Sequence, residues 1–319
     1  MLGLRLRMWL LTALLFAIVY AIVSVISYSL GIGNFYFYLG LSLVMMLVQY
    51  MIGPKIVEWS MRVRYIKENE YPRLHAMVRD LAAKAKLPAP RIGIAQIAIP
   101  NAFAFGRSIR DGRICVTEGI LNLLNEEELR AVLGHEMSHI KNRDVLTITL
   151  LSVIPVILYR IAWQFLFFGG NRRERSGNAA LVGLVAFLFY FLTNLLVLYA
   201  SRIREYFADK GSVELGNSPS WLASALYKLV YGSARLPKEA LKDAEGMKAF
   251  FANDPSRALQ EFKDLRALDL DKSGTISSQE LEFLRVKPIR LGTGDRLLEL
   301  LSTHPNMLKR IKRLSEYSQ

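Results

Sequence analysis

The chain has 319 residues, a single cysteine and a formal net charge of +13 at pH 7, and 52% of its residues are hydrophobic. A single cysteine excludes an internal disulfide and a thiolate metal site, and it fits a reducing compartment. High hydrophobicity combined with 22% charged residues indicates separate apolar and charged blocks rather than one uniform globule.

Long apolar segments predict a protein of the membrane. Residues 8–54 contain no Asp, Glu, Lys or Arg, and the stretch LGIGN (Leu30–Asn34) divides them. Since one span needs about 20 apolar residues, this block predicts a membrane hairpin over 1–54 rather than a cleaved signal peptide. A second hairpin is expected over 145–200, where Pro155 and Arg160 weaken the first span. The four predicted spans are about 9–29, 35–53, 145–168 and 179–200.

Basic residues flank the predicted spans on one side, as is typical of cytoplasmic faces. They are Arg5, Arg7, Lys55, Arg62, Arg64, Lys67, Lys141, Arg143, Arg202, Arg204 and Lys210. This bias predicts a multi-pass protein of the plasma or inner membrane with both termini in the cytoplasm. The loop GGNRRERSGN (Gly169–Asn178) disagrees, which leaves open that the last two spans do not fully cross. Because these basic residues lie next to the spans rather than in a patch interleaved with aromatic residues, we expect the lipid bilayer and not nucleic acid as a partner.

The sequence between the two hairpins predicts an α+β domain. Apolar residues at helical spacing predict a helix over 70–86, and LPAP ends it. Over 91–121, β-branched and apolar residues alternate with small or polar ones, and RDGR is a turn signal. This pattern predicts two or three strands. Asn125 and Glu128 then form a capping-box pattern that begins a helix containing HEMSH.

The HEMSH motif predicts a zinc site. His135 and His139 share one helix face, so both imidazoles can bind one ion. Glu136 points away from that face but can reach a water on the metal, as the general base of a zinc protease does. Two histidines do not complete a catalytic zinc site, since such a site has three protein ligands. We therefore expect one Zn²⁺ per chain and a third ligand elsewhere.

Candidates for that third ligand follow the fourth predicted span. Glu205 would complete a His₂Glu site, and Asp209, one turn later, could accept a hydrogen bond from a ligand histidine. His75 and His304 are the remaining histidines. From spacing alone, Glu205 is equally compatible with ordinary charge at a membrane exit.

Four separated motifs resemble those of one family. GHEMSHIKNRD, a hydrophobic hairpin, SRIREYFADKGS (Ser201–Ser212), PNAFAFG (Pro100–Gly106) and STHPNMLKRIKRL (Ser302–Leu314) are similar to segments of the HtpX family of integral-membrane zinc metallopeptidases, relatives of the CAAX-prenyl proteases. The resemblance covers nearly the whole chain. It implies zinc bound by His135, His139 and Glu205, with Glu136 as base.

The same resemblance implies roles for two further residues. Asn101 would hold the substrate backbone, and an amide beside a sheet edge can bond an extended peptide. His304 would stabilise the transition state, since an imidazolium near the metal can bond an oxyanion. From the residues alone, Asn101 is equally explained as a turn residue after Pro100, and His304 as a helix cap or surface residue before Pro305.

A second metal motif lies near the C-terminus. DLDKSGTISSQE matches an EF-hand loop, with Asp269, Asp271, Ser273, Thr275 and Glu280 as ligand candidates and Gly274 at the sharp turn. We expect an EF-hand-like insert over 257–287. It either binds Ca²⁺ or keeps the helix–turn–helix shape without an ion.

Together these patterns predict a mainly α integral membrane protein with about four transmembrane helices and a cytoplasmic zincin-like α+β metalloprotease domain with a small β-sheet. The predicted segments are 1–54 and 145–200 for the hairpins, and 55–144 and 201–319 for the protease domain. The expected activity is endopeptidase cleavage of protein substrates, by resemblance misfolded or damaged membrane proteins. The alternatives are a prenyl-protein processing protease and a non-catalytic, calcium-responsive membrane scaffold.

Overall fold

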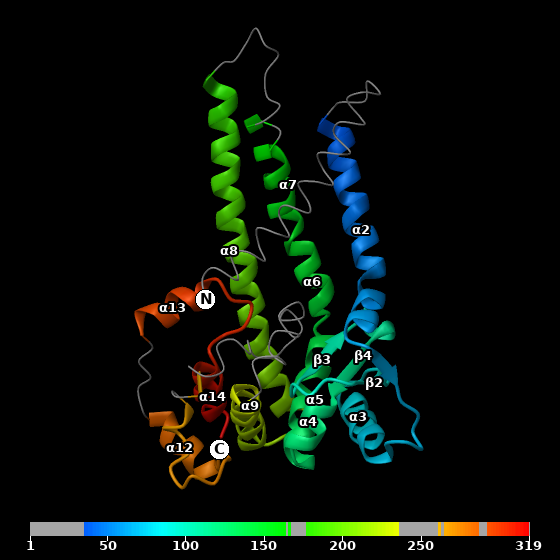
Figure 1. Cartoon of the computed structure of the whole chain (residues 1–319), viewed down its shortest axis with the longest axis vertical. Coiled ribbons are helices and arrows are strands. Elements are labelled where there is room, and N and C mark those ends of the chain that lie inside the picture. The colour runs from blue at the N-terminus through cyan, green and yellow to red at the C-terminus, as the bar shows by residue number, and fades with distance from the viewer. Residues whose placement is uncertain are drawn as a thin grey trace. The chain divides into compact units, whose positions relative to one another are not determined.

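The chain forms two compact units in the computed structural model, residues 1–49 with 155–190 and residues 50–154 with 191–319. The structure describes residues 35–163, 165–166, 177–235, 261–262, 265–286 and 292–318 (Figure 1). Described residues of the first unit are helical, whereas the second unit holds the sheet and the clustered charged side chains. The predicted segment boundaries stay a prediction.

Two apolar helices among the described residues are long enough to cross a membrane, Asp144–Trp163 and Ala180–Glu214. They correspond to the third and fourth predicted spans. The second predicted span lies within helix α2 (Phe35–Ser60), and the first, 9–29, lies outside the described residues. A total of four spans therefore remains a prediction.

The third predicted span is not one uninterrupted helix. It consists of α6 (Asp144–Leu151) and α7 (Val153–Trp163), separated at Ser152. Pro155 explains the interruption, because it has no N–H to donate to the carbonyl four residues earlier and its ring crowds that carbonyl. By contrast, α8 (Gly177–Glu214) runs straight through the predicted boundary at 200/201. One continuous helix thus carries both the apolar span and Glu205.

A mixed sheet of four strands organises the second unit. The strands are β1 (Val63–Tyr65), β2 (Arg91–Ala95), β3 (Ala102–Phe105) and β4 (Arg113–Thr117), in the order β1-β2-β4-β3. The pair β2–β4 is parallel and the other two pairs are antiparallel. The stretch 91–121 therefore holds three strands, and β3 lies at the sheet edge. Asn101 directly precedes β3 and does not end a strand.

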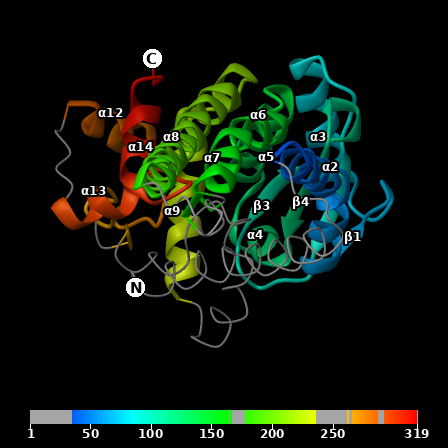
Figure 2. The same ribbon diagram turned by 90° about the horizontal axis from the view of Figure 1, so that it is seen from above.

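Six helices among the described residues of the second unit contribute buried residues to one apolar core that also includes strand residues. They are α3 (Pro72–Ala85), α4 (Glu118–Leu123), α5 (Glu126–Lys141), α9 (Pro219–Ala234), α12 (Ser278–Val286) and α14 (Met307–Ser315). A further helix, α13 (Thr293–Leu300), precedes α14. Helix α9 contacts both α5 and α14. In both views α3 lies at one end of this unit and α12 at the other (Figures 1 and 2). Buried Leu133, Met137 and Leu226 belong to the same core.

Helix α5 begins as the sequence predicts. The Asn125 side chain accepts from the Glu128 N–H, and the Glu128 carboxylate accepts from the Asn125 N–H. This capping box satisfies two donors that the first turn would otherwise leave unpaired. It sets the start of the helix, and hence which residues of HEMSH face inward.

Glycines let α5 and α8 approach closely. A Cβ on Gly211 would collide with the Ser138 hydroxyl and lie 2.8 Å from Ser138 Cβ. A Cβ on Gly134 would collide with the Asn217 amide and lie 2.8 Å from Ser212 Oγ. Since neither helix could approach so closely with an alanine at these positions, the two glycines position the HEMSH helix beside the residues that follow the span of α8.

Candidate metal centre

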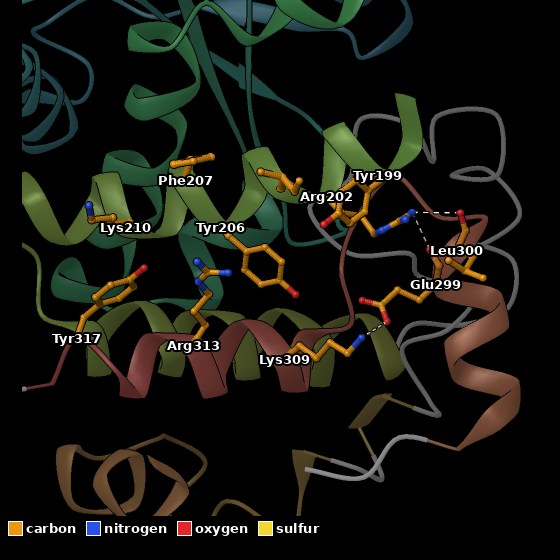
Figure 3. Close-up of a pocket in the computed structure, with 11 residues that line it drawn as sticks. Tyr199, Arg202, Tyr206, Phe207, Lys210, Glu299, Leu300, Lys309, Arg313 and Tyr317 are labelled. Atoms are coloured by element: carbon orange, nitrogen blue, oxygen red, sulfur yellow. Dashed lines mark hydrogen bonds and ion pairs between the residues drawn. The ribbon is translucent and has the colours of Figure 1, made fainter. Parts of the chain in front are cut away.

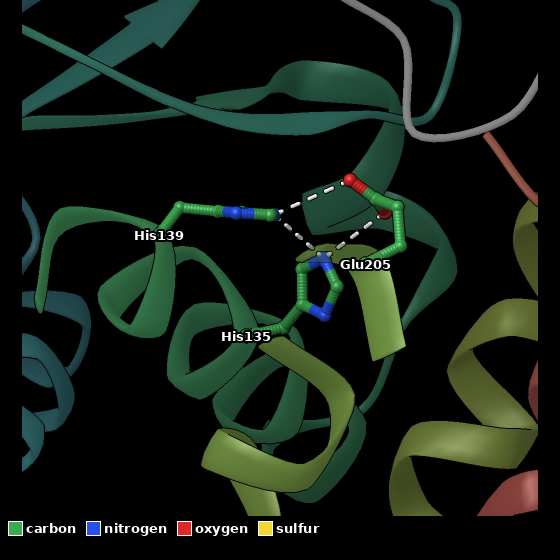
Figure 4. A group of neighbouring side chains, drawn as sticks. All are labelled: His135, His139 and Glu205. Carbon is green, nitrogen blue, oxygen red and sulfur yellow. Dashed lines mark hydrogen bonds and ion pairs between the residues drawn. The ribbon is translucent and has the colours of Figure 1, made fainter. Parts of the chain in front are cut away.

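Two histidines of α5 meet one carboxylate of α8. His135 Nε2 and His139 Nε2 lie 3.1 Å apart, as expected for positions one turn apart on the same helix face. Glu205 Oε2 lies 3.5 Å from His135 Nε2, and Glu205 Oε1 lies 3.5 Å from His139 Nε2. Figure 4 shows the three side chains pointing toward one another from two helices.

The spacing of these donor atoms fits zinc. Ligand atoms about 2.0–2.1 Å from a tetrahedral ion lie about 3.3 Å from one another. The observed edges of 3.1, 3.5 and 3.5 Å bracket that value. Two imidazoles and a carboxylate are also the ligand types of a catalytic site that keeps a fourth position open. The residues present therefore fit the metal that the sequence predicts.

Each ligand histidine has a carboxylate on its other ring nitrogen. Asp209 Oδ1 lies 2.9 Å from His135 Nδ1, and Asp144 Oδ2 lies 2.5 Å from His139 Nδ1. A carboxylate there holds the proton on Nδ1 and leaves the Nε2 lone pair for a metal. The contact of Asp209 is the one that the sequence predicts. Asp144 was missed, although an acidic residue just after the HEMSH helix is a usable signal.

Arg310 is the second residue that sequence reasoning missed. It is almost fully buried and reaches Asp209 with two bonds, Nη2–Oδ1 of 2.6 Å and Nε–Oδ2 of 2.9 Å. Its Nη1 also lies 3.3 Å from Glu205 Oε2. A buried guanidinium with two carboxylates is charge-compensated and geometrically fixed. Arg310 thus joins α14 to the carboxylates of α8.

Glu136 is buried beside the histidines and near the sheet edge. Burial raises the pKa of its carboxyl, while the nearby imidazoles and a backbone hydrogen bond from Ala104 of β3 act in the opposite direction. A higher proton affinity suits a residue that must accept a proton near neutral pH. The structure therefore brings the predicted base to the predicted metal ligands.

The two residues assigned through resemblance lie differently. His304 is 23% exposed, and its Nδ1 lies 3.5 Å from Glu205 Oε2, so it borders the metal centre. Asn101 is fully buried, and its backbone carbonyl accepts a hydrogen bond of 2.9 Å from the Thr117 N–H. Its position directly before edge strand β3 is compatible with contact to an extended peptide. Their roles stay predictions.

The C-terminal loop gathers a second set of carboxylates. Ligand atoms of Asp269, Asp271 and Glu280 all lie within 4.8 Å of one another. The hydroxyls of Ser273 and Thr275 are 2.9 Å apart. Gly274 has φ +79°, which explains why glycine stands at this turn. Half of the segment before the loop, residues 257–260 and 263–264, lies outside the described residues, and α12 follows the loop.

Comparison with known proteins places these features in a family context. The model of peptidase family M48 matches residues 68–318. A protease HtpX homolog of Methanothermobacter thermautotrophicus is 56% identical over 227 residues, which cover 71% of this chain and 86% of that protein. A protease HtpX homolog of Moorella thermoacetica is 34% identical over 325 residues, covering 99% and 95%.

A solved structure gives an independent view of the fold. The chain is similar to the crystal structure of S. mikatae Ste24p, with a TM-score of 0.51 and 15% sequence identity. The match covers 98% of this chain and 67% of the other. At this level of sequence identity, the structural similarity shows a shared fold and carries no argument about substrates.

Proposed function

Because the chain belongs to peptidase family M48 and is a membrane zinc metallopeptidase, we propose that it cleaves misfolded or damaged membrane proteins with His135, His139, Glu205 and Glu136 as its catalytic centre. The observation that carries the assignment of residues is the triangle of donor atoms with edges of 3.1, 3.5 and 3.5 Å. Glu136, whose carboxyl pKa is raised by burial, lies beside it.

The side chains divide the chemistry among them. Zinc supplies Lewis-acid chemistry, because it lowers the pKa of water and polarises a carbonyl. Glu136 takes the proton of the attacking water and delivers it to the leaving amine nitrogen. Asp209 and Asp144 keep the protons of His135 and His139 on Nδ1.

Binding and charge stabilisation use the residues around that centre. Asn101 and β3 align the peptide backbone of the substrate, since β3 lies at the sheet edge and an extended peptide can add to such a strand. His304 donates to the oxyanion that develops on the substrate carbonyl.

Membrane proteins are the proposed substrates because of where Glu205 lies. It belongs to the same continuous helix as the apolar span, five positions after Ala200. Prenyl-protein processing is the alternative within enzymes, and the likeness to Ste24p supports it only through the fold. A non-catalytic scaffold is disfavoured because Glu136 beside the ligands has no purpose in a purely structural site.

The test of catalysis is Glu136→Gln in the purified full-length protein. We expect zinc to be retained and cleavage of an unfolded protein substrate to fall about 10²–10⁴-fold, because the amide cannot accept a proton. The control is Glu127→Gln, an exposed residue of the same helix. Unchanged cleavage by the Glu136 variant with zinc bound would falsify the catalytic assignment.

We propose that the metal centre and both termini face the cytoplasm, supported by the basic residues that flank the spans. Two variants, Ser176→Cys and Gln319→Cys, test this orientation. The measurement is the labelling of each introduced cysteine by a membrane-impermeant maleimide on intact cells. Native Cys115 gives little background, because burial raises the pKa of its thiol to about 12. Ser176→Cys should be labelled at once and Gln319→Cys only after lysis. Protection of both would show that the second hairpin does not cross.

A calcium site at Asp269, Asp271 and Glu280 is a separate proposal, favoured by carboxylate oxygens within 4.8 Å of one another. Ca²⁺ should then raise the Tm of the full-length protein, because an ion that binds only the folded state stabilises it. Asp271→Asn, which changes an exposed ligand, should abolish that rise. No calcium-dependent change in the wild type would remove the proposal.

A further inference from the structure

A pocket of about 610 Å³ lies between α8, α13 and α14, away from the metal ligands. Figure 3 shows side chains of α8 and α14 facing each other across it. Its lining holds four basic side chains and one acidic one, together with four aromatic residues. They are Arg202, Lys210, Lys309, Arg313, Glu299, Tyr199, Tyr206, Phe207 and Tyr317.

The position of this pocket along α8 sets its depth in a bilayer. Residues 180–200 contain no charged side chain and span about 30 Å at about 1.5 Å per residue, which equals the hydrocarbon thickness. The pocket residues of α8 begin at Tyr199, in the last turn of that stretch, and continue to Lys210. They therefore lie at the depth of the lipid headgroups.

The charges of the pocket are only partly compensated. Glu299 is paired with Lys309 at 2.5 Å. Arg202 donates to the backbone carbonyls of Glu299, Leu300 and Ser302, which carry no net charge. Arg313 stacks over the Tyr206 ring at 4.8 Å from its centroid. Lys210 forms an ion pair with Glu214 of the same helix at 3.2 Å, and both side chains are about half exposed. Such exposed pairs are weak. Since the one acid in the lining is already paired with Lys309, Arg313 and the solvent-open Lys210 favour an anion.

The lining also presents exposed aromatic rings, and one of them, Tyr199, belongs to the apolar stretch of α8. Tyr199 and Phe207 are 56% and 59% exposed, and Arg202 lies over the Tyr199 ring at 5.7 Å. Aromatic rings at a membrane interface contact acyl chains on one side and polar groups on the other. A ligand that combines an anionic group with a hydrocarbon chain matches both halves of the lining.

We propose that this pocket binds the phosphate headgroup of an anionic phospholipid, with Arg313, Lys210 and Arg202 facing the phosphate and the rings facing the upper acyl chain. Basic pockets beside membrane helices are suited to such headgroups. The site goes beyond the proposed proteolysis, and its test needs no enzymatic activity.

The experiment measures binding of phosphatidylglycerol to the purified full-length protein in phosphatidylcholine nanodiscs. Arg313→Gln should weaken the apparent Kd about 5-fold, and Arg313→Gln with Lys210→Gln about 25-fold, since each basic residue near anionic lipid contributes about that factor. Arg73→Gln is the matched control, because it removes an exposed arginine of α3 that forms an ion pair with exposed Glu126, away from the pocket. Unchanged Tm and zinc content check the fold of each variant.

Three results would overturn the proposal. Equal affinity of all variants would mean that phosphatidylglycerol does not use this pocket. An equal loss with Arg73→Gln would mean attraction by overall charge. Full displacement of the lipid by millimolar inorganic phosphate or by an acidic peptide would assign the pocket to those anions instead. Selective weakening in the pocket variants, with phosphate displacing little, supports it.

Discussion

At the scale of single residues, Arg310 connects the parts of the metal centre. Its guanidinium donates to both carboxylate oxygens of Asp209 and approaches Glu205. It therefore orients Glu205, the proposed third ligand, and Asp209, the carboxylate that contacts His135. Arg310→Lys keeps the charge but cannot reproduce the two parallel bonds. We expect about a 10–100-fold loss of zinc affinity, as for other residues that orient metal ligands.

Arg313→Lys is the control for this prediction, because it makes the same change at an exposed position of the same helix. Zinc affinity should be measured by competition with a chelator in the purified protein. Zinc binding by Arg310→Lys at wild-type affinity would mean that the guanidinium is structural and leaves the metal unaffected.

Residues linked by local spacing were predictable, and residues linked by tertiary packing were not. His135 and His139 share a helix face through a fixed period, and Asp209 was recognised from its place one turn after Glu205. Arg310 lies on α14, whereas the two carboxylates that it contacts, Asp209 and Glu205, lie on α8. Its sequence surroundings, Lys309 to Arg313, are rich in basic residues, so nothing local distinguishes the buried arginine from exposed ones.

At the scale of elements, the close approach of α5 and α8 determines whether the ligands meet. Gly211→Ala should place a methyl group against Ser138 and push the helices apart. Forcing atoms into a packed interface costs about 1–3 kcal/mol. We therefore expect a lower Tm and weaker zinc binding, measured on the same preparation.

Two further variants isolate the cause of that effect. Ser138→Gly combined with Gly211→Ala should recover much of the loss, because the colliding side chain is removed. Gly53→Ala in α2, where a Cβ would meet nothing within 4 Å, should leave both quantities near wild type. A Gly211→Ala protein with full stability and zinc affinity would contradict the packing argument.

The sequence pattern predicts which segments are helices and which are strands, but it does not predict where a helix is interrupted or continues. The capping box of Asn125 and Glu128 determines the start of α5, and a local signal of this kind can be read from sequence. The sequence marks Pro155 as a weak point of the third span, and the structure has a break nearby, between α6 and α7. The uninterrupted course of α8 past residue 200 was not predictable, because the hydrophobic pattern ends there and the helix does not.

At the scale of the whole molecule, the metal centre is assembled from distant segments. The histidines come from α5, the carboxylates from α8 and the supporting arginine from α14. Glu205 lies in sequence beyond the second hairpin, so a metal site can form only when both sides of that hairpin are folded. The family resemblance therefore predicts a third ligand, Glu205, that spacing could not distinguish from ordinary charge.

Zinc content of the purified Glu205→Gln protein tests this account most directly. Metal analysis of the wild type and of the Glu127→Gln control should give one zinc per chain. Glu205→Gln should lose most of the metal after dialysis against a chelator concentration that the wild type withstands, because two imidazoles alone do not hold a catalytic zinc. Full zinc retention by the Glu205 variant would contradict the account, since a different residue would then be the third ligand.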